Sequence, residues 1–401
     1  MWIEIEVEAQ GENVRIAGRG SRGERPAPHT MAPDQSFDAL SNFASKIGRY
    51  VRQAKPLDAP MVEAAQALHE SVYRGELRDV MQRLLEASKD NPLLVRLFVQ
   101  DASLQGVPWE ALCQPSTTEG FVGTNPRLVM ARGVNSSDPW EPREVRGAVR
   151  VLAIGPGAEI QTIDALRMVL ASAIEAGEIE WLEPITGPDV SAKFLYDRLR
   201  RGKTPHIVHF IGHGSVDMSG KPVLRLADDN DGEEVWITAE SFARELSASF
   251  YEELRLVVLE ACDGGKAGAF GSAAEILVKA GADAVVAHLW PVRAETAQTC
   301  SLELYRSLTG ADKTLGDIGA SMSAVRRTVL AQSAEAFSPI LCLRGSDSVL
   351  FNFEGRRLTK ASGAKKARNL AAALQSLLEN PYTFVLGDLD ALGLLDHGDH
   401  L

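Results

Sequence analysis

Residues 254–265 have the sequence LRLVVLEACDGG, an aliphatic run that ends in a polar turn with two glycines. Residues 205–214, PHIVHFIGHG, form a second run of the same kind and end in a Gly-His-Gly turn. Short apolar runs bounded by turn residues are typical of strands that are buried on both faces. We therefore expect two buried strands, each followed by a turn that carries a reactive side chain.

Strands and helices alternate on either side of these two runs. Further strand patterns occur at AVRVLAIGPG (148–157), ADAVVAHLWPV (282–292) and PILCLRG (339–345), and apolar residues recur with helical spacing between them, for example over 162–176 and 294–308. Such alternation indicates crossover connections and a mostly parallel sheet with helices on both faces. The predicted fold class is α/β.

The two ends of the chain differ from this central part. Residues 2–16 alternate apolar and polar side chains around a turn at 11–13. Helical spacing follows from about 37, and a compact apolar run at 94–100 indicates a further strand. Near the other end, residues 364–380 have the pattern of one amphipathic helix. We therefore expect three parts: an N-terminal β and helical part (1–147), a central α/β domain (148–355) and a C-terminal helical extension (356–401).

Charge and hydropathy limit the expected partners. The 401 residues include 42 Lys and Arg against 54 Asp and Glu, a formal net charge of −12. Nucleic acids and anionic membranes bind basic surfaces, so we expect neither as a main partner. No apolar stretch approaches the roughly 18 residues of a transmembrane helix, and the start, MWIEIEVEAQ, is unlike a signal peptide.

The cysteines show neither a disulfide framework nor a metal site. The chain has four cysteines, Cys113, Cys262, Cys300 and Cys342. None belongs to a Cys-x-x-Cys pair or to a Cys/His cluster with zinc-ligand spacing. We expect no metal, no cofactor and a reduced, cytoplasmic compartment.

The two strand-end turns carry the candidate chemistry. Reactive side chains of open α/β sheets gather at the carboxyl ends of the strands, where His213 and Cys262 are expected. If the two strands are neighbours, the imidazole can partner a thiol nucleophile, and the backbone N–H groups of Gly214 and Cys262 can stabilise an oxyanion. A lone cysteine or histidine is more often a packing residue, and spacing alone leaves the strand order open.

Six blocks of the sequence occur in the order and at the intervals of one family. They are GVPWEAL (106–112), VRVLAIGPG (149–157), HIVHFIGHG (206–214), LVVLEACDGG (256–265), KAGADAVVAHLWPVRAETAQ (279–298) and SPILCLRG (338–345). With these blocks the chain resembles the CHAT family of caspase-like cysteine peptidases, related to separase and metacaspase, over about 90–345. The resemblance implies a caspase-like catalytic domain over 148–355, with a mostly parallel sheet flanked by helices, and an N-terminal helical/β subdomain.

The resemblance also implies an activity. His213 matches the family's catalytic histidine and Cys262 its nucleophile, so we expect a cysteine endopeptidase with a protein substrate. The other three cysteines are then packing residues. CHAT peptidases are commonly inactive until a regulatory protein or ligand rearranges the cleft, and in bacteria they often serve antiviral defence or cell death.

One position departs from the commonest family pattern. Many CHAT proteins have Asn two residues before the nucleophile, where this chain has Glu260. In metacaspases and separases an acid at this position lines the S1 pocket, so the resemblance implies cleavage after a basic residue, with Arg first. Asp217, just past the histidine turn, is a second S1 candidate. The alternative is that Glu260 pairs with an internal arginine such as Arg293.

Two other functions remain open at this point. A catalytically silent protein of the same fold could bind a peptide in its cleft. A nucleotide- or phosphate-binding protein could use GPGAEI (155–160), although the chain lacks GxxxxGK[ST] and GxGxxG. The residues that follow the 364–380 helix are interpreted either as a docking element or pseudosubstrate, or as a peripheral extension of the fold.

Overall fold

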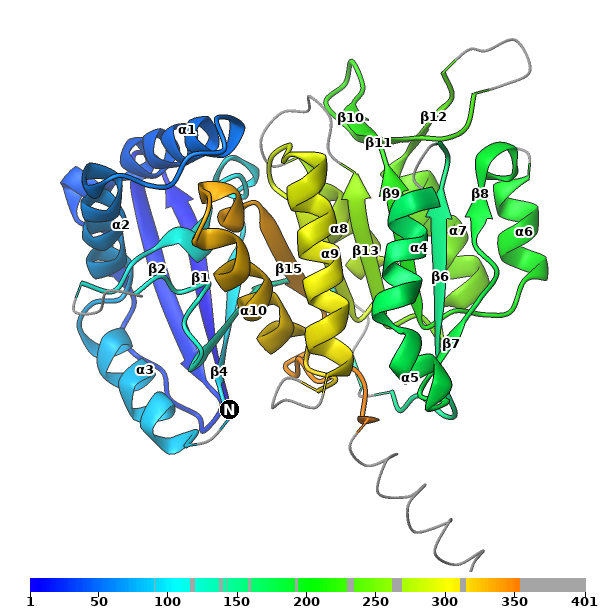
Figure 1. Ribbon diagram of the computed structural model, residues 1–401. Helices are drawn as coiled ribbons and strands as arrows, with labels where there is room; N and C mark the ends of the chain where they lie inside the picture. Colours follow the sequence, from blue (N-terminus) through cyan, green and yellow to red (C-terminus); the bar gives the residue numbers. More distant parts are fainter. Residues whose placement is uncertain are drawn as a thin grey trace, which may run out of the picture. The chain divides into compact units, whose positions relative to one another are not determined.

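Figure 1 shows the computed structural model, in which Met1–Phe351 is the first of two units. The structure describes residues 1–89, 91–115, 120–136, 140–141, 143–157, 160–191, 194–228, 234–261, 269–310 and 315–353. The predicted C-terminal extension lies outside these residues, and the domain boundaries after residues 147 and 355 stay predictions. None of the helices in the described ranges combines the length and apolar character that crossing a bilayer needs.

The described residues form a twelve-stranded sheet with the order β3-β2-β1-β4-β5-β15-β14-β13-β9-β6-β7, and β8 pairs with β6. Its strands are β1 (Trp2–Gln10), β2 (Asn13–Gly20), β3 (His29–Thr30), β4 (Leu93–Val99), β5 (Leu128–Gly133), β6 (Val149–Gly155), β7 (Ile179–Trp181), β8 (Ile185–Thr186), β9 (Ile207–Gly212), β13 (Leu256–Ala261), β14 (Ala284–His288) and β15 (Pro339–Leu343). The predicted strands of the N-terminal part and of the central part therefore belong to one sheet.

The sheet consists of two halves whose parallel strands run in opposite directions. Strands β6, β9, β13 and β14 are parallel to one another, and so are β1, β4, β5 and β15, whereas β2 is antiparallel to both β1 and β3. The halves meet antiparallel at β14 and β15, where His288 pairs with Pro339. The carboxyl ends of β9 and β13 therefore lie on one rim of the sheet, and the carboxyl end of β15 lies on the other rim.

Three short strands form a second, separate sheet. Its order is β10 (Gly214–Val216), β11 (Pro222–Arg225) and β12 (Trp236–Thr238), with antiparallel pairing throughout. These strands are each three or four residues long. They lie outside the main sheet because β10 turns away from it directly after β9, as Figure 1 shows, and β11 and β12 pair with β10 and with each other in order.

Helices cover both faces of the main sheet. Their bounds are α1 (Phe37–Arg52), α2 (Ala59–Val72), α3 (Glu76–Ala87), α4 (Ile160–Val169), α5 (Ala171–Glu175), α6 (Leu195–Arg201), α7 (Ala239–Phe250), α8 (Ala269–Lys279), α9 (Ala294–Thr309) and α10 (Ile318–Leu330). Helices α4, α9 and α10 lie on the near face in Figure 1, and α7 and α8 lie on the far face.

Polar side chains fix where several helices begin. The carboxylate of Asp317 accepts hydrogen bonds from the backbone N–H groups of Gly319 and Ala320 at the start of α10. Thr238 caps α7 in the same way by accepting from the N–H of Ser241. Such caps satisfy N–H groups that have no partner inside the helix.

Alternation along β13 separates an apolar face from a polar one. Val257, Leu259 and Ala261 belong to the main hydrophobic core, which also contains Leu277 of α8. Glu260 points to the opposite face, where it contacts a side chain of α9. The period of two along a strand therefore turns this acid toward the side covered by α9.

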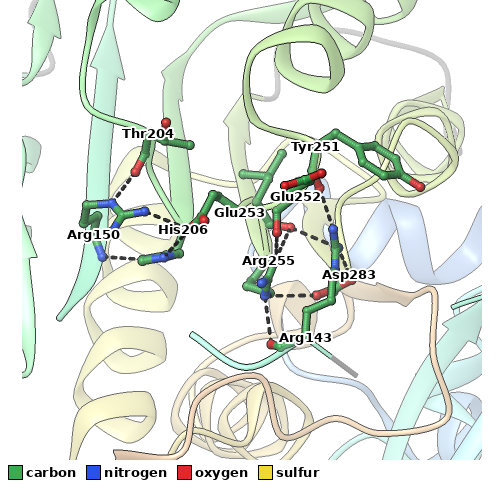
Figure 2. Close-up of polar contacts among 10 residues, drawn as sticks. Arg143, Arg150, Thr204, His206, Tyr251, Glu252, Glu253, Arg255 and Asp283 are labelled. Carbon is green, nitrogen blue, oxygen red and sulfur yellow. Dashed lines mark hydrogen bonds and ion pairs between the residues drawn. The ribbon is translucent and has the colours of Figure 1, made fainter. Parts of the chain in front are cut away.

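A polar cluster holds the segment around Arg143 against the amino ends of β13 and β14 (Figure 2). The Arg143 guanidinium donates to the carboxylate of Asp283 and to the carbonyls of Tyr251, Leu254 and Gly281. The guanidinium of Arg255 donates to the carbonyl of Arg143 over 3.1 Å. Arg143, which lies between β5 and β6 in the chain, is therefore fixed to the rim of the sheet opposite the carboxyl ends of β9 and β13.

Candidate active site

The two strands that precede the candidate dyad are neighbours. Strands β9 and β13 pair in parallel over their whole length, from Ile207 with Leu256 to Gly212 with Ala261. His213 directly follows Gly212, and position 262 directly follows Ala261. The residues directly before the two members of the predicted dyad therefore lie side by side at one rim of the sheet, which sequence spacing alone could not predict.

The structure describes one member of the predicted dyad. His213 is exposed and lies between β9 and β10. Cys262 and the glycines that follow it belong to residues 262–268, which lie outside the described residues. Gly214, the other predicted oxyanion residue, is buried at the start of β10. The dyad and the oxyanion hole stay predictions.

The histidine turn is fixed by its neighbours. The His213 carbonyl accepts a hydrogen bond from the Arg225 N–H over 2.9 Å, which ties the turn to β11. A Cβ atom at Gly212 would lie 3.2 Å from both Cδ and Cγ of Pro156, closer than side chains normally pack. Glycine therefore lets the turn after β6 approach the end of β9. The candidate phosphate-binding segment GPGAEI (155–160) begins in this turn, and its residues 158 and 159 lie outside the described residues.

The Asp217 carboxylate is engaged in a local turn. It accepts hydrogen bonds from the backbone N–H groups of Ser219 and Lys221 and from the Ser219 hydroxyl, at 2.7–2.9 Å. The Ser219 hydroxyl bond is the main reason why the pKa of Asp217 is lowered. These contacts shape the β10–β11 hairpin, and the S1 role of Asp217 stays a prediction.

Glu260 lies under α9 with two polar neighbours. Its side chain is 9% exposed, and Oε2 accepts a hydrogen bond from the Ser301 hydroxyl. The same oxygen lies 3.3 Å from Nε2 of His209 on β9. Within the described part of the chain, no lysine or arginine lies within ion-pair distance of this carboxylate. Glu260 is therefore an almost buried acid without a strong cation beside it.

The suggested pairing of Glu260 with Arg293 is wrong. The Arg293 guanidinium binds Glu335 instead, with Nε and Nη2 at 3.1 and 2.8 Å from Oε2. The Arg293 backbone N–H donates to the other carboxylate oxygen of Glu335. Glu335 also accepts from the Thr296 hydroxyl, so all of these contacts hold the start of α9.

Two histidines near Glu260 are buried. His209 is fully buried, and its Nδ1 lies 3.2 Å from the Tyr305 hydroxyl. His288, at the end of β14, is also buried, and burial lowers its pKa to about 4 against the opposing charges of Glu260 and Glu335. At neutral pH, His288 is therefore uncharged and does not compensate the Glu260 carboxylate.

Ser301 and Tyr305 were not identified as candidate site residues from the sequence. Both are buried on α9, and their spacing of four residues places them on one face of the helix. The signal available was this spacing within a predicted helix. Without the position of the helix over the sheet, it could not be told from ordinary packing.

The remaining cysteines are buried. The exposed fractions of Cys113, Cys300 and Cys342 are 2%, 5% and 2%. Burial raises the pKa of the Cys300 and Cys342 thiols to about 12, so these thiols are protonated at neutral pH. Neither thiol can act as a thiolate nucleophile there.

Comparison with protein families decides the family. The CHAT domain model matches residues 62–341. The chain belongs to the CHAT family. The match starts inside α2 and ends inside β15, while β1 of this CHAT protein pairs with β4 in the same sheet. The folded unit therefore begins before the family match.

Solved structures of two other proteins are similar to this CHAT protein. The separase of the Saccharomyces cerevisiae separase–securin complex matches with a TM-score of 0.53 at 11% identity, over 86% of this chain and 30% of the separase chain. The Arg-specific cysteine proteinase gingipain R of Porphyromonas gingivalis matches with a TM-score of 0.44 at 12% identity, over 78% of this chain and 74% of its own. Comparison with curated sequences gave no match. The separase match shows that the fold of the CHAT protein is caspase-like, and the family model places the chain in a family of cysteine peptidases.

Proposed function

We propose that this CHAT protein is a cysteine endopeptidase with His213 and Cys262 as its dyad. One observation carries the proposal: β9 and β13 pair in parallel up to Gly212 and Ala261, the residues directly before the two members of the dyad. A thiol and an imidazole on adjacent strand ends are the minimum that nucleophilic cysteine catalysis requires.

The proposed reaction has two steps. The Cys262 thiolate attacks the scissile carbonyl, and the backbone N–H groups of Gly214 and Cys262 stabilise the oxyanion. The His213 imidazolium donates a proton to the leaving amine, which leaves an acyl-enzyme. Water deprotonated by the same imidazole then hydrolyses the thioester and frees the thiol.

We further propose that the substrate has arginine before the scissile bond. Glu260 lies two residues before Cys262, and its nearly buried carboxylate has no lysine or arginine within ion-pair distance in the described residues. A buried charge without a counter-charge is costly. A substrate guanidinium would supply that counter-charge and two parallel hydrogen bonds.

The biological setting is inferred from the family. We infer a protein substrate, a regulatory protein or ligand, and a role in bacterial defence or cell death inside the cytoplasm. The separase match comes from a complex with securin, which supports a protein partner. This chain covers only 30% of that separase chain, so partners outside the shared fold are not implied.

Peptide cleavage tests the proposal. Peptides that differ only in Arg, Lys, Leu or Asp before the scissile bond are incubated with wild type, Cys262→Ala and Glu260→Gln. We expect wild type to favour Arg, Cys262→Ala to cleave nothing and Glu260→Gln to lose the Arg preference. Glu303→Gln, which removes an acid on α9, is the matched control and should keep the preference.

Two results would contradict the proposal in different ways. Equal cleavage by wild type and Cys262→Ala would contradict the cysteine mechanism. A preference of wild type for Leu or Asp peptides would contradict the S1 role of Glu260 but not the proposed dyad. Peptide binding by wild type without cleavage would favour the catalytically silent interaction module.

A further inference from the structure

Two side chains from different elements converge on one oxygen of Glu260. The Ser301 hydroxyl of α9 donates to Oε2, and Nε2 of His209 on β9 lies 3.3 Å from the same atom. The exposed fractions of Ser301 and His209 are 4% and 0%. Since water barely reaches these two groups, they compete little with solvent for the carboxylate.

His209 is held in turn by the same helix. Its Nδ1 lies 3.2 Å from the Tyr305 hydroxyl, and the two rings lie 5.6 Å apart. Burial keeps the Tyr305 phenol protonated by raising its pKa far above the usual range. The hydroxyl can therefore donate to Nδ1, which leaves the ring proton on Nε2, a buried atom that makes no hydrogen bond of standard geometry and lies 3.3 Å from Oε2 of Glu260. Ser301 and Tyr305, one turn apart on α9, thus act on the same carboxylate.

Ser301 and His209 contact only one of the two carboxylate oxygens of Glu260. Both contacts are made to Oε2, and neither is made to Oε1. Fixing one oxygen fixes the plane of the carboxylate while the second oxygen stays available to a cation. A guanidinium depends on this plane because it forms two parallel hydrogen bonds, whereas an ammonium group is a point charge with rotatable donors.

We propose that Ser301 and His209 are positioning residues that fix the Glu260 carboxylate plane and thereby favour arginine over lysine in the substrate. This inference rests on the proposed S1 role of Glu260. On this inference, residues of α9 and β9 determine the preference for arginine over lysine, and the negative charge of Glu260 alone does not.

Removal of the Ser301 hydroxyl tests the inference. We measure kcat and KM for Arg and Lys peptides with wild type, Ser301→Ala, Ser301→Thr and Thr299→Ala. We expect Ser301→Ala to lower kcat/KM for Arg about tenfold, through KM, and for Lys less than about threefold. Ser301→Thr keeps a hydroxyl and should restore the ratio. Thr299→Ala removes an exposed hydroxyl from the same helix and should leave the ratio unchanged.

A binding measurement reads the same preference without cleavage. Benzamidine, a planar amidinium, and benzylamine, an ammonium, are titrated into Cys262→Ala with and without Ser301→Ala or His209→Gln. We expect either added substitution to weaken benzamidine binding about tenfold and benzylamine binding less than about threefold. Since His209 is fully buried, His209→Gln is compared only if its circular dichroism matches that of wild type.

The outcomes separate this inference from the proposed function. If Glu260→Gln loses the Arg preference but Ser301→Ala keeps the Arg-to-Lys ratio of Thr299→Ala, the positioning role is overturned and the S1 role survives. If Glu260→Gln keeps the preference, or if Cys262→Ala binds neither cation, the S1 assignment and the positioning role are overturned together.

Discussion

Asp283 binds residues between β5 and β6 to the rim of the sheet, and we expect its substitution to lower the free energy of unfolding. Its side chain is 4% exposed and accepts hydrogen bonds from Trp140, over 3.1 Å, and from Arg143. The guanidinium Nε of Arg255 lies 3.5 Å from its second oxygen. Figure 2 shows Arg143 and Arg255 on either side of this one acid.

The expected magnitude follows from these contacts. Removing one member of a buried ion pair costs about 3–5 kcal/mol, since the partner charge stays buried. Arg143 is 22% exposed and keeps its bonds to backbone carbonyls, which places Asp283→Ala near the lower end, at about 3 kcal/mol. Asp283→Asn keeps an oxygen that can accept from Trp140, so we expect about 2 kcal/mol.

Equilibrium urea unfolding, followed by tryptophan fluorescence, measures these losses. Asp347→Ala is the control because it removes an exposed acid after β15, and we expect a change below about 0.5 kcal/mol. A double-mutant cycle with Arg143→Ala should give a coupling of about 1 kcal/mol or more. Two results would refute this role of Asp283. One is a loss of unfolding free energy below about 1 kcal/mol for Asp283→Ala. The other is a double mutant whose loss equals the sum of the two single losses.

Two further predictions concern packing and pH. Gly319→Ala should destabilise by about 1–3 kcal/mol because its Cβ would overlap Cγ1 of Val129, whereas Gly271→Ala, with no neighbour closer than 3.8 Å, should be neutral or stabilising by up to about 1 kcal/mol. Thermal unfolding distinguishes the two, and equal signs would contradict the packing account. Burial lowers the pKa of both His69 and His288 to about 4, so the unfolded chain takes up protons first as the pH falls. Stability should therefore decrease from about pH 6.5 toward pH 4, by up to about 1.4 kcal/mol per pH unit for each histidine. His69→Gln should reduce the slope by about one proton, and an unchanged slope between pH 7 and 5 would contradict the burial effect.

The individual strands could be predicted because their apolar runs are local features. The runs at 205–214 and 254–265 contain β9 and β13, each ending at a glycine or polar turn. Their adjacency could not be predicted, since strand order depends on how helices cross the sheet rather than on any one strand. The antiparallel direction of β15 could not be predicted either, because a strand buried on both faces has the same apolar pattern whichever way it runs.

The candidate site could be predicted less completely than the fold. Glu260 was identified from its place before Cys262, but its contacts with Ser301 and His209 join three separate elements. The incorrect pairing with Arg293 shows the same limit. Charge complementarity selects a class of partner, and only the packing of α9 determines that Glu335 takes this arginine.

The antiparallel junction of β14 and β15 has a practical consequence for labelling the protein. The chain after β15 emerges on the rim opposite His213, one strand length away, or roughly 17–20 Å. Ser346 is exposed there. A fluorophore attached through Ser346→Cys, or an affinity tag inserted beside it, would report on rotation and assembly of the molecule without reaching a peptide bound at the histidine turn.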